Sequence, residues 1–398
     1  MNQPMILITM TGPDRPGIIA AMTGQIAEAG ARIRDIEQTV THTLLSLSVV
    51  IDFPTGESNQ KPLIKDLLFL AKEWGLDLDF QVLDEQDYRR RTGRNSYVLT
   101  IMGGEVNARA LAQISRILAE DRVNIERISK LTQGQLRCVE LLINVPLALD
   151  VRALNRRLLS AGSDLGVDVA VQKESLHRRA KRLVVMDMDS TLIQIEVIDE
   201  LARLAGVGAQ VAQITHRAMN GELDFQGALR ERVALLKGLP AAALEEVYRT
   251  IPFTPGAKTL VRILKRLGFR TAVISGGFTF FTDRLKDELG LDYAFANGLE
   301  IVDGQVTGQV NGPIVDGARK AELLEEIARR EGIALDQTIA IGDGANDLPM
   351  LGRAGLGIAF NAKARVREEA DTHINQQSLD SILYLLGLSE WEMAELDA

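Results

Sequence analysis

Acidic residues follow two apolar runs of the chain, at points where they could hold a metal ion. Asp187 and Asp189 follow the run LVVM, and Asp343 and Asp347 follow the run TIAIG. Several carboxylates gathered beyond buried strands are costly unless a cation lies among them. Carboxylate and carbonyl oxygens suit a hard divalent ion such as Mg²⁺. The pattern therefore predicts a magnesium site.

A hydroxyl, free backbone N–H groups and a lysine complete this set. The run TAVIS ends at Ser275 and continues into Gly276 and Gly277, whose backbone N–H groups suit a phosphate. Lys320 stands near the start of a helical segment, where the helix dipole disfavours a cation unless an anion lies nearby. Together these residues predict phosphoryl transfer. One Asp attacks phosphorus, Mg²⁺ and Lys320 screen the charge, and a second carboxyl group protonates the leaving alkoxide.

The elements that must position these residues form a second pattern. Short apolar runs at 183–187, 271–275, 338–342 and 356–360 are mostly separated by helical segments. This alternation is typical of a doubly wound parallel sheet, which binds ligands beyond the carboxyl ends of its strands. Residues 196–250 show no clear strand and predict a helical insertion that covers the edge of the sheet.

The N-terminal part predicts the order β-α-β-β-α-β twice, which is the ferredoxin-like unit. In the first unit we expect strands at 5–10, 32–41, 43–52 and 77–83 and helices at 16–29 and 61–75. In the second we expect strands at 97–102, 123–131, 136–144 and 167–172 and helices at 108–120 and 150–164.

The net charge and the cysteine content argue against several classes of protein. The 398 residues carry a formal net charge of -9, which disfavours a general nucleic-acid binder. The charged stretches 84–95 and 173–182 are therefore interpreted as solvated linkers rather than nucleic-acid patches. Cys138 is the one cysteine, so an internal disulfide and a Cys-based zinc site are excluded. We see no signal peptide or long apolar run, and expect a soluble cytoplasmic protein without membrane contact.

The two N-terminal units resemble ACT domains, which bind small ligands. The resemblance rests on Gly12-Pro13-Asp14-Arg15-Pro16-Gly17-Ile18, where glycine allows close approach and a helix N-terminus can receive a carboxylate. The second unit has Gly103-Gly104-Glu105-Val106-Asn107 and lacks the Asp-x-Pro-Gly turn. The resemblance implies an amino-acid effector near Gly17, with L-serine expected, and pairing into a homodimer. A role in dimerisation alone remains the alternative.

Residues 183–375 resemble the haloacid dehalogenase (HAD) superfamily of phosphatases. The resemblance rests on Asp187-x-Asp189-x-Thr191, Ser275, Lys320 and Gly342-Asp343-Gly344-x-x-Asp347 in this order. It makes Asp187 the nucleophile and Asp189 the general acid/base, while Ser275 and Lys320 hold the phosphoryl group. It assigns Mg²⁺ to Asp187, the Asp189 backbone carbonyl and Asp343. Asp347 would orient Lys320 and the water around the metal, and Asn346, Gly276 and Gly277 would lie near the phosphate.

Within this superfamily, the stretches DMDSTLIQIEVIDELARLAGV and MNGELDFQGALRERVALLKGLP resemble the phosphoserine phosphatase family. The resemblance implies that Glu196 receives the substrate ammonium and Arg232 its carboxylate, while Met219 and Phe225 close over the substrate. The substrate would be O-phospho-L-serine, hydrolysed to L-serine and phosphate in the last step of L-serine biosynthesis.

The expected fold is α/β, with a HAD-type Rossmann-like parallel sheet and a helical cap after two ferredoxin-like ACT domains. We expect these domains at 1–88, 95–175 and 182–398, with the cap at approximately 196–254.

Other functions remain open from the sequence. The phosphatase could act on another small phosphomonoester or on phosphoproteins. The chain could also be an amino-acid sensor with a vestigial phosphatase fold, although the complete Asp187, Asp189, Lys320 and Asp343 set argues against this. A calcium loop in GDGAND lacks the EF-hand spacing. No motif places a histidine beside Ser275, so a Ser-His triad is disfavoured.

Overall fold

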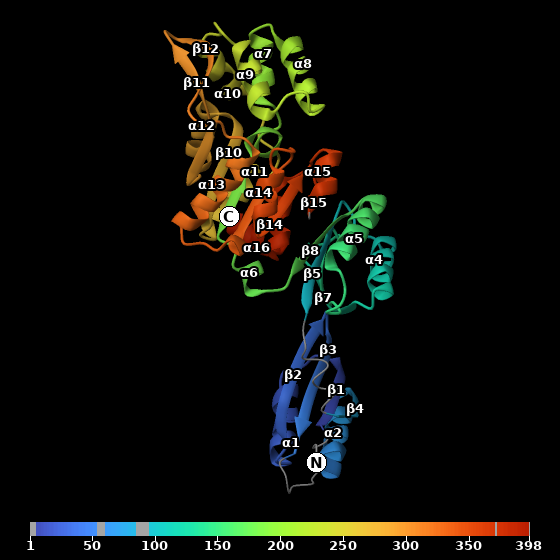
Figure 1. Ribbon diagram of the computed structural model, residues 1–398. Coiled ribbons are helices and arrows are strands. Elements are labelled where there is room, and N and C mark those ends of the chain that lie inside the picture. The colour runs from blue at the N-terminus through green and yellow to red at the C-terminus, as the bar shows by residue number, and fades with distance from the viewer. Residues whose placement is uncertain (1–4, 54–59, 85–94, 371, 398) are drawn as a thin grey trace. The chain divides into compact units, whose positions relative to one another are not determined.

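The computed structural model describes residues 5–53, 60–84, 95–370 and 372–397 (Figure 1). The chain divides into two units, Met1–Arg94 and Asn95–Ala398. Most of the predicted linker at 84–95, and with it the expected domain end at 88, lies outside the described residues. Among the described residues, no helix is long and apolar enough to cross a membrane.

The first unit is a βαββαβ domain with a four-stranded antiparallel sheet in the order β2-β3-β1-β4. Its elements are β1 (Met5–Pro13), α1 (Ile18–Glu28), β2 (Arg32–Thr41), β3 (Leu44–Asp52), α2 (Gln60–Trp74) and β4 (Asp77–Leu83). Alternate strand residues such as Ile8 and Leu47 form a core with Met22 and Leu67 of the helices. Gly17 precedes α1 with φ 101°, a conformation that favours glycine.

The second unit begins with another βαββαβ domain, whose sheet has the order β6-β7-β5-β8. Its elements are β5 (Ser96–Met102), α4 (Ala108–Glu120), β6 (Asn124–Lys130), β7 (Cys138–Asn144), α5 (Val151–Leu165) and β8 (Asp168–Lys173). Both helices have side-chain caps: Asn107 accepts a hydrogen bond from Ala110 N, and Asp150 accepts from Arg152 N and Ala153 N. The element order agrees with the sequence prediction in both domains.

The C-terminal domain contains a seven-stranded sheet in the order β12-β11-β10-β9-β13-β14-β15. Its strands are β9 (Leu183–Met186), β10 (Arg270–Phe278), β11 (Tyr293–Val302), β12 (Gln305–Asn311), β13 (Thr338–Gly342), β14 (Leu356–Phe360) and β15 (His373–Ile374). The four predicted strands pair in parallel at its centre. The antiparallel hairpin of β11 and β12 was not predicted, and it forms one edge of the sheet.

Helices surround this sheet and form a cap above it (Figure 1). The cap consists of α7 (Val197–Leu204), α8 (Gly208–Met219), α9 (Phe225–Ala234) and α10 (Ala242–Thr250). These four helices occupy the predicted helical insertion, and α9 lies against the edge strand β12. The remaining helices are α11 (Ala257–Arg266), α12 (Thr279–Leu289), α13 (Gly317–Arg330), α14 (Leu348–Arg353), α15 (Ala364–Glu369) and α16 (Glu390–Asp397). Shorter helical turns are η1 (Met188–Leu192), η2 (Leu335–Gln337) and η3 (Leu379–Leu386).

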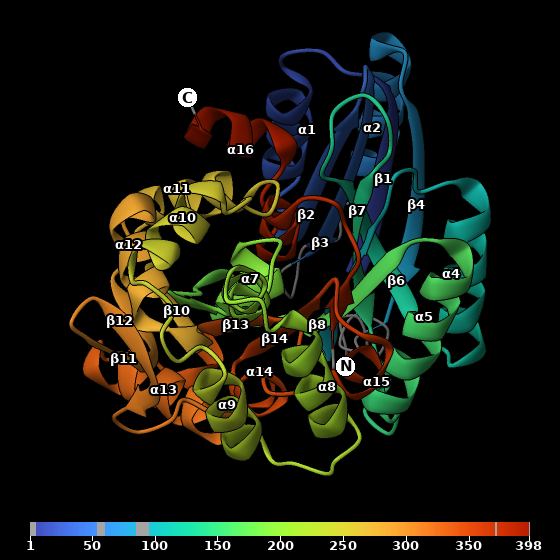
Figure 2. The same cartoon turned by 90° about the horizontal axis from the view of Figure 1, so that it is seen from above.

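The second βαββαβ domain shares a hydrophobic core with the C-terminal domain. Met102, Cys138 and Ala170 belong to the same buried cluster as Leu383 and Leu385 of η3. Figure 2 shows α15 beside α5 in a second view. Cys138 is fully buried, and burial raises the pKa of its thiol to about 12.

The predicted linker at 173–182 is not fully solvated. It forms the short helix α6 (Leu176–Arg179), and its residues Arg178 and Lys181 are buried. Arg178 pairs with Glu140 of β7, which explains how the charge is accommodated. The sequence shows only a run of charges here, and the partner on β7 is distant in the chain.

Candidate active site

The candidate nucleophile lies where the central strand β9 ends. Asp187 directly follows this strand, and its Oδ1 accepts a hydrogen bond from Met188 N at 2.8 Å. The Nζ of Lys320 lies 2.8 Å from the same oxygen. Burial, followed by the charge of Asp347, raises the pKa of Asp187 well above its ordinary value, while Lys320 opposes this shift. An ammonium at this distance can keep a buried carboxylate ionised.

Lys320 is held between two carboxylates. It lies in the first turns of α13 and is 0% exposed, and its Nζ is 2.7 Å from Asp347 Oδ1. Although burial lowers it, Asp187 and Asp347 raise the pKa of Lys320 above its ordinary value. Asp347 is fixed in turn by a hydrogen bond from Gly344 N to its Oδ2 at 2.9 Å. The anions expected near this lysine are therefore present.

Asp189 lies two residues beyond Asp187 with its carboxyl group held at both oxygens. Val197 N donates to Oδ1 at 2.9 Å, and Ser275 Oγ donates to Oδ2 at 3.2 Å. Burial, followed by the charge of Glu196, raises the pKa of Asp189 to about 7. A carboxyl group with this pKa can both give and take a proton near neutral pH.

The glycines after Ser275 leave room for neighbouring side chains to lie close to the backbone. A Cβ at Gly277 would lie 2.9 Å from Asp189 Oδ2 and 3.1 Å from Ser275 Oγ, so a larger residue would displace one of them. Gly277 N donates a hydrogen bond to Ser275 Oγ at 2.8 Å. Ser275 is thus oriented by the irregular C-terminal end of its own strand, β10.

Three buried carboxylates form a group suited to a cation. Oxygen atoms of Asp187, Asp343 and Asp347 lie within 4.8 Å of one another. Asp343 accepts from Thr191 Oγ1 at 3.4 Å and has no ion pair within 4 Å in the described part of the chain. Burial, followed by the charge of Asp347, raises the pKa of Asp343 to about 7. Such a set of hard oxygen donors, short of positive charge, fits a divalent metal ion.

A cavity of about 610 Å³ opens in front of these groups and extends under the cap. Its lining includes these predicted site residues: Asp187, Asp189, Glu196, Met219, Phe225, Arg232, Gly276, Gly277, Asp343 and Asn346. Ser275, Lys320 and Asp347 are 0% exposed and lie behind this lining. Met219 is 63% exposed at the cap, whereas the ring of Phe225 lies so near Gly276 that a Cβ there would be 2.7 Å from it.

The cap contributes one cation to the cavity. Arg232 of α9 is half-buried, and its Nε donates to Ala228 O at 3.3 Å. Burial lowers its pKa, and it makes no ion pair within 4 Å among the described residues. Its guanidinium therefore retains N–H donors for an anionic ligand. Glu196 is held by a hydrogen bond from Ser190 Oγ at 2.9 Å.

Sequence reasoning missed two charged residues of this cavity, Asp199 and Lys363. Asp199 lies in the first turn of α7, and Lys363 precedes α15, far along the chain. Asp199 stands inside the stretch DMDSTLIQIEVIDELARLAGV but was given no role, and Lys363 belongs to no motif that the sequence analysis singled out. The predicted effector residue Gly17 is in the other unit of the chain and is not part of this cavity.

The fold and the site define a haloacid dehalogenase-like hydrolase, and this family matches residues 184–352. ACT domains match residues 4–81 and 95–172. Over 396 residues the chain is 45% identical to the phosphoserine phosphatase of Streptomyces coelicolor, covering 99% of this chain and 95% of that relative. It is 42% identical over 393 residues to that of Mycobacterium tuberculosis, with coverage of 99% and 95%. The chain belongs to the phosphoserine phosphatase family with ACT domains.

Solved structures agree with this family. A HAD family hydrolase from Salmonella enterica serovar Typhi has a TM-score of 0.64 and 33% identity, covering 73% of this chain and 98% of that one. A probable phosphoserine phosphatase from Vibrio cholerae, in unliganded form, has a TM-score of 0.60 and 36% identity, with coverage of 76% and 89%. The C-terminal domain is therefore a phosphatase domain.

Proposed function

We propose that this chain is a phosphoserine phosphatase that hydrolyses O-phospho-L-serine to L-serine and phosphate, the last step of L-serine biosynthesis. One observation carries the proposal. The cavity that contains the paired Asp187 also contains Arg232, a cation without an ion pair within 4 Å among the described residues, and the carboxylate of Glu196. Arg232 and Glu196 complement the carboxylate and ammonium of phosphoserine, and Lys320 beside Asp187 supplies positive charge for its phosphate. Full-length relatives named phosphoserine phosphatase support the assignment.

The reaction would begin at Asp187. Its carboxylate attacks phosphorus to form an aspartyl-phosphate, while Lys320 neutralises charge and Ser275 holds a phosphoryl oxygen. Asp189 donates a proton to the departing serine oxygen. Its carboxylate then takes a proton from water, which attacks the aspartyl-phosphate and releases phosphate. The pKa of about 7 suits Asp189 to both steps.

We propose Mg²⁺ as the metal ion, held by Asp187, Asp343 and the backbone carbonyl of Asp189. Asp347 would orient Lys320 and the water around the ion, which agrees with its contact to Lys320 at 2.7 Å. The ion supplies positive charge that lets an anionic nucleophile approach a phosphate. Buried carboxylates in excess of the single Lys320 support this choice.

Substrate selection would depend on the cap. Arg232 would bind the carboxylate and Glu196 the ammonium, while Met219 and Phe225 close over the substrate. Asn346, Gly276 and Gly277 would lie near the phosphate.

We further propose an amino-acid effector, L-serine, at the turn that contains Gly17, and a cytoplasmic homodimer paired through ACT domains. The turn before α1 supports the effector site, because Gly17 adopts φ 101° and leaves the helix N-terminus uncapped by a side chain.

Phosphate release from O-phospho-L-serine tests the proposal, with p-nitrophenyl phosphate as a substrate that lacks the amino-acid groups. We expect a strong preference for phosphoserine, dependence on Mg²⁺, and suppression by added L-serine. Asp187→Asn should abolish turnover of both substrates because it removes the nucleophile. Turnover that survives this change would contradict the assignment of Asp187. Equal rates on the two substrates would instead contradict the roles of Glu196 and Arg232.

A further inference from the structure

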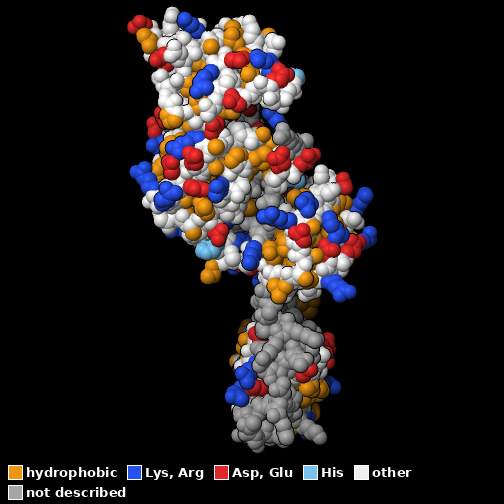
Figure 3. Space-filling model, viewed as in Figure 1, with side chains coloured by type: hydrophobic (Ala, Val, Ile, Leu, Met, Phe, Trp, Pro, Cys, Tyr) orange, Lys and Arg blue, Asp and Glu red, His pale blue; other side chains and the backbone are white. Residues whose placement is uncertain are grey.

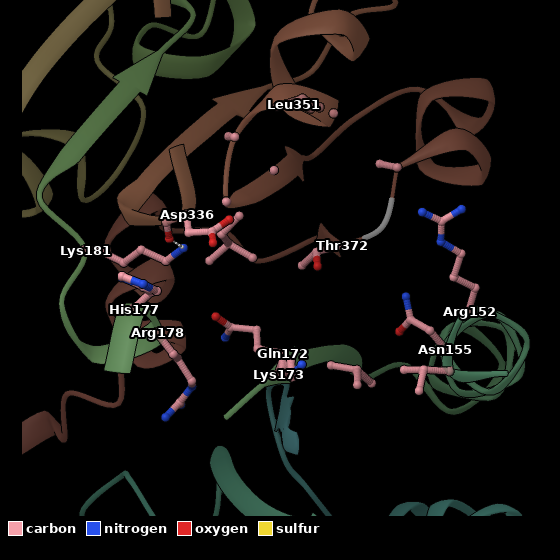
Figure 4. Close-up of a pocket in the computed structure, with 18 of the residues that line it drawn as sticks. Arg152, Asn155, Gln172, Lys173, His177, Arg178, Lys181, Asp336, Leu351 and Thr372 are labelled. Atoms are coloured by element: carbon pink, nitrogen blue, oxygen red, sulfur yellow. Dashed lines mark hydrogen bonds between the residues drawn. The ribbon is translucent and has the colours of Figure 1, made fainter. Parts of the chain in front are cut away.

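A second cavity, of about 590 Å³, lies between the second ACT domain and the phosphatase domain. Its walls come from α5 and β8 of the ACT domain, from α6, and from η2, α14, β14 and α15 of the phosphatase domain (Figure 4). None of its lining residues belongs to the cavity of the active site. Its volume is in the range of sites that bind small molecules.

A buried lysine that has no carboxylate within 4 Å among the described residues lies in this cavity. Lys181 is 7% exposed, and its Nζ donates to two backbone carbonyls, Asp336 O at 2.7 Å and Thr338 O at 3.4 Å. No carboxylate in the described part of the chain lies within 4 Å of it. Burial lowers the pKa of Lys181 to about 8, and the charge of Asp336, which lies beyond ion-pair distance, only partly opposes this shift. One of its three N–H donors remains for a ligand.

Further cationic groups lie around Lys181. Arg152 of α5 and Lys173 at the end of β8 line the cavity and form no ion pair within 4 Å among the residues described. Arg178 is 4% exposed, and its terminal nitrogens contact Glu140 and Glu174. Its Nε has no hydrogen-bond partner among the described residues. Figure 3 shows Lys and Arg side chains gathered on the surface where the second ACT domain meets the phosphatase domain.

The remaining lining is mixed. Among the described residues of the lining, Asp336 and Glu369 are acidic, so cationic side chains outnumber carboxylates there. Leu351 and Leu356 supply apolar surface, and Gln172 extends its amide toward the cavity (Figure 4). An inorganic ion would make no hydrophobic contact with Leu351 and Leu356. The lining therefore suits an organic molecule with a negative group.

We infer that this cavity binds a small organic anion, whose carboxylate or phosphate group serves as the counterion of Lys181. Arg152 and Lys173 would attract the anion at the entrance, and its carbon atoms would contact Leu351 and Leu356.

The position of the site gives the ligand a direct contact with elements of the active site. α14 lines the cavity through Leu351 and Gly352, and it begins directly after Asp347, which holds Lys320. α15 contributes Glu369 to this cavity and Val366 to that of the active site.

Isothermal titration calorimetry of the full-length protein tests the inference, with succinate as the carboxylate probe and inorganic phosphate as the phosphate probe. We expect at least one probe to bind the wild-type chain, and Lys181→Met to weaken this binding at least tenfold. Arg182→Gln is the matched control, because Arg182 is an exposed cation in the same segment that does not line the cavity. Phosphate binding that survives Lys181→Met belongs to the active site. The probe whose binding Lys181→Met weakens shows whether the site prefers a carboxylate or a phosphate group.

A second variant fills the cavity without removing a charge. Gly352 lies in α14, and a Cβ there would meet no atom within 4 Å, so Gly352→Leu should fold. We expect it to lose the same binding as Lys181→Met. If neither probe binds the wild-type chain at millimolar concentration, or if both variants bind them like Arg182→Gln, the inference is wrong.

Discussion

Replacement of Arg232 by alanine should separate substrate recognition from phosphoryl transfer. The guanidinium lines the cavity of the active site, is half-buried, and has no ion pair within 4 Å among the described residues. Its Nε contact with Ala228 O leaves the terminal nitrogens for a bidentate contact with a carboxylate. Arg232→Ala removes this contact and leaves Asp187 and Lys320 unchanged.

The expected loss follows from the burial of the contact. A charged, bidentate hydrogen bond in a partly desolvated site contributes about 2–4 kcal/mol. Since each ~1.4 kcal/mol is a factor of ten, kcat/KM for O-phospho-L-serine should fall about 30- to 1,000-fold. p-Nitrophenyl phosphate has no carboxylate, so its kcat/KM should change less than about threefold by the same relation.

Steady-state phosphate release on both substrates measures this difference. Arg230→Ala is the matched control, because Arg230 is exposed on the same helix and does not line the cavity. It should leave both substrates unaffected. The reasoning is refuted if Arg232→Ala slows both substrates equally, or if Arg230→Ala produces the same selective loss.

Three further predictions concern stability. Asp168, 4% exposed, accepts hydrogen bonds from the backbone and side-chain nitrogens of Asn375, so Asp168→Asn should lower the free energy of unfolding by about 2–4 kcal/mol in urea. An unchanged value would contradict this. Gly17 has φ 101°, so Gly17→Ala should lower the free energy of unfolding of the first unit by about 1–3 kcal/mol and weaken inhibition by L-serine. Gly24→Ala, where an added Cβ meets no atom within 4 Å, should do neither. Thermal unfolding measures the difference in stability between the two variants. Because burial lowers the pKa of Lys181 to about 8 from 10.5, the folded chain binds fewer protons than the unfolded chain between these values. The free energy of unfolding of the wild type, relative to that of Lys181→Met, should therefore rise by about 1–3 kcal/mol from pH 8 to 10.5. If urea unfolding shows the same difference between the two proteins at both pH values, this prediction is wrong.

The centre of the phosphatase domain could be predicted because its strands are short apolar runs that end in polar residues. Because the carboxyl ends of parallel strands lie at the same edge of a sheet, the sequence alone predicts that Asp187, Ser275 and Asp343 lie together. The structure brings these residues to one site, with Lys320 between Asp187 and Asp347. The position of Lys320 was predictable for a further reason, since a cation near the start of a helix needs an anion.

Other features depend on contacts that a local pattern does not contain. The β11–β12 hairpin has weaker alternation and lies at the edge, half exposed, so no apolar run marks it. Lys363 reaches the active site only through the path of the chain after β14. The burial of Arg178 depends on Glu140, on a strand of another domain. For Lys363 and Arg178 the neighbouring groups are distant in sequence, whereas the hairpin joins consecutive strands that are only partly buried.

The two ACT domains differ in how they are joined to the rest of the chain. The first keeps the Gly12–Ile18 turn and belongs to a separate unit of the chain. In the second, Gly103 and Gly104 line a cavity together with residues 375–378 of the phosphatase domain, and Cys138 lies in the common core. A domain whose core is continuous with the enzyme moves only if the enzyme's packing also changes. The second ACT domain therefore contacts the phosphatase domain directly through packed side chains.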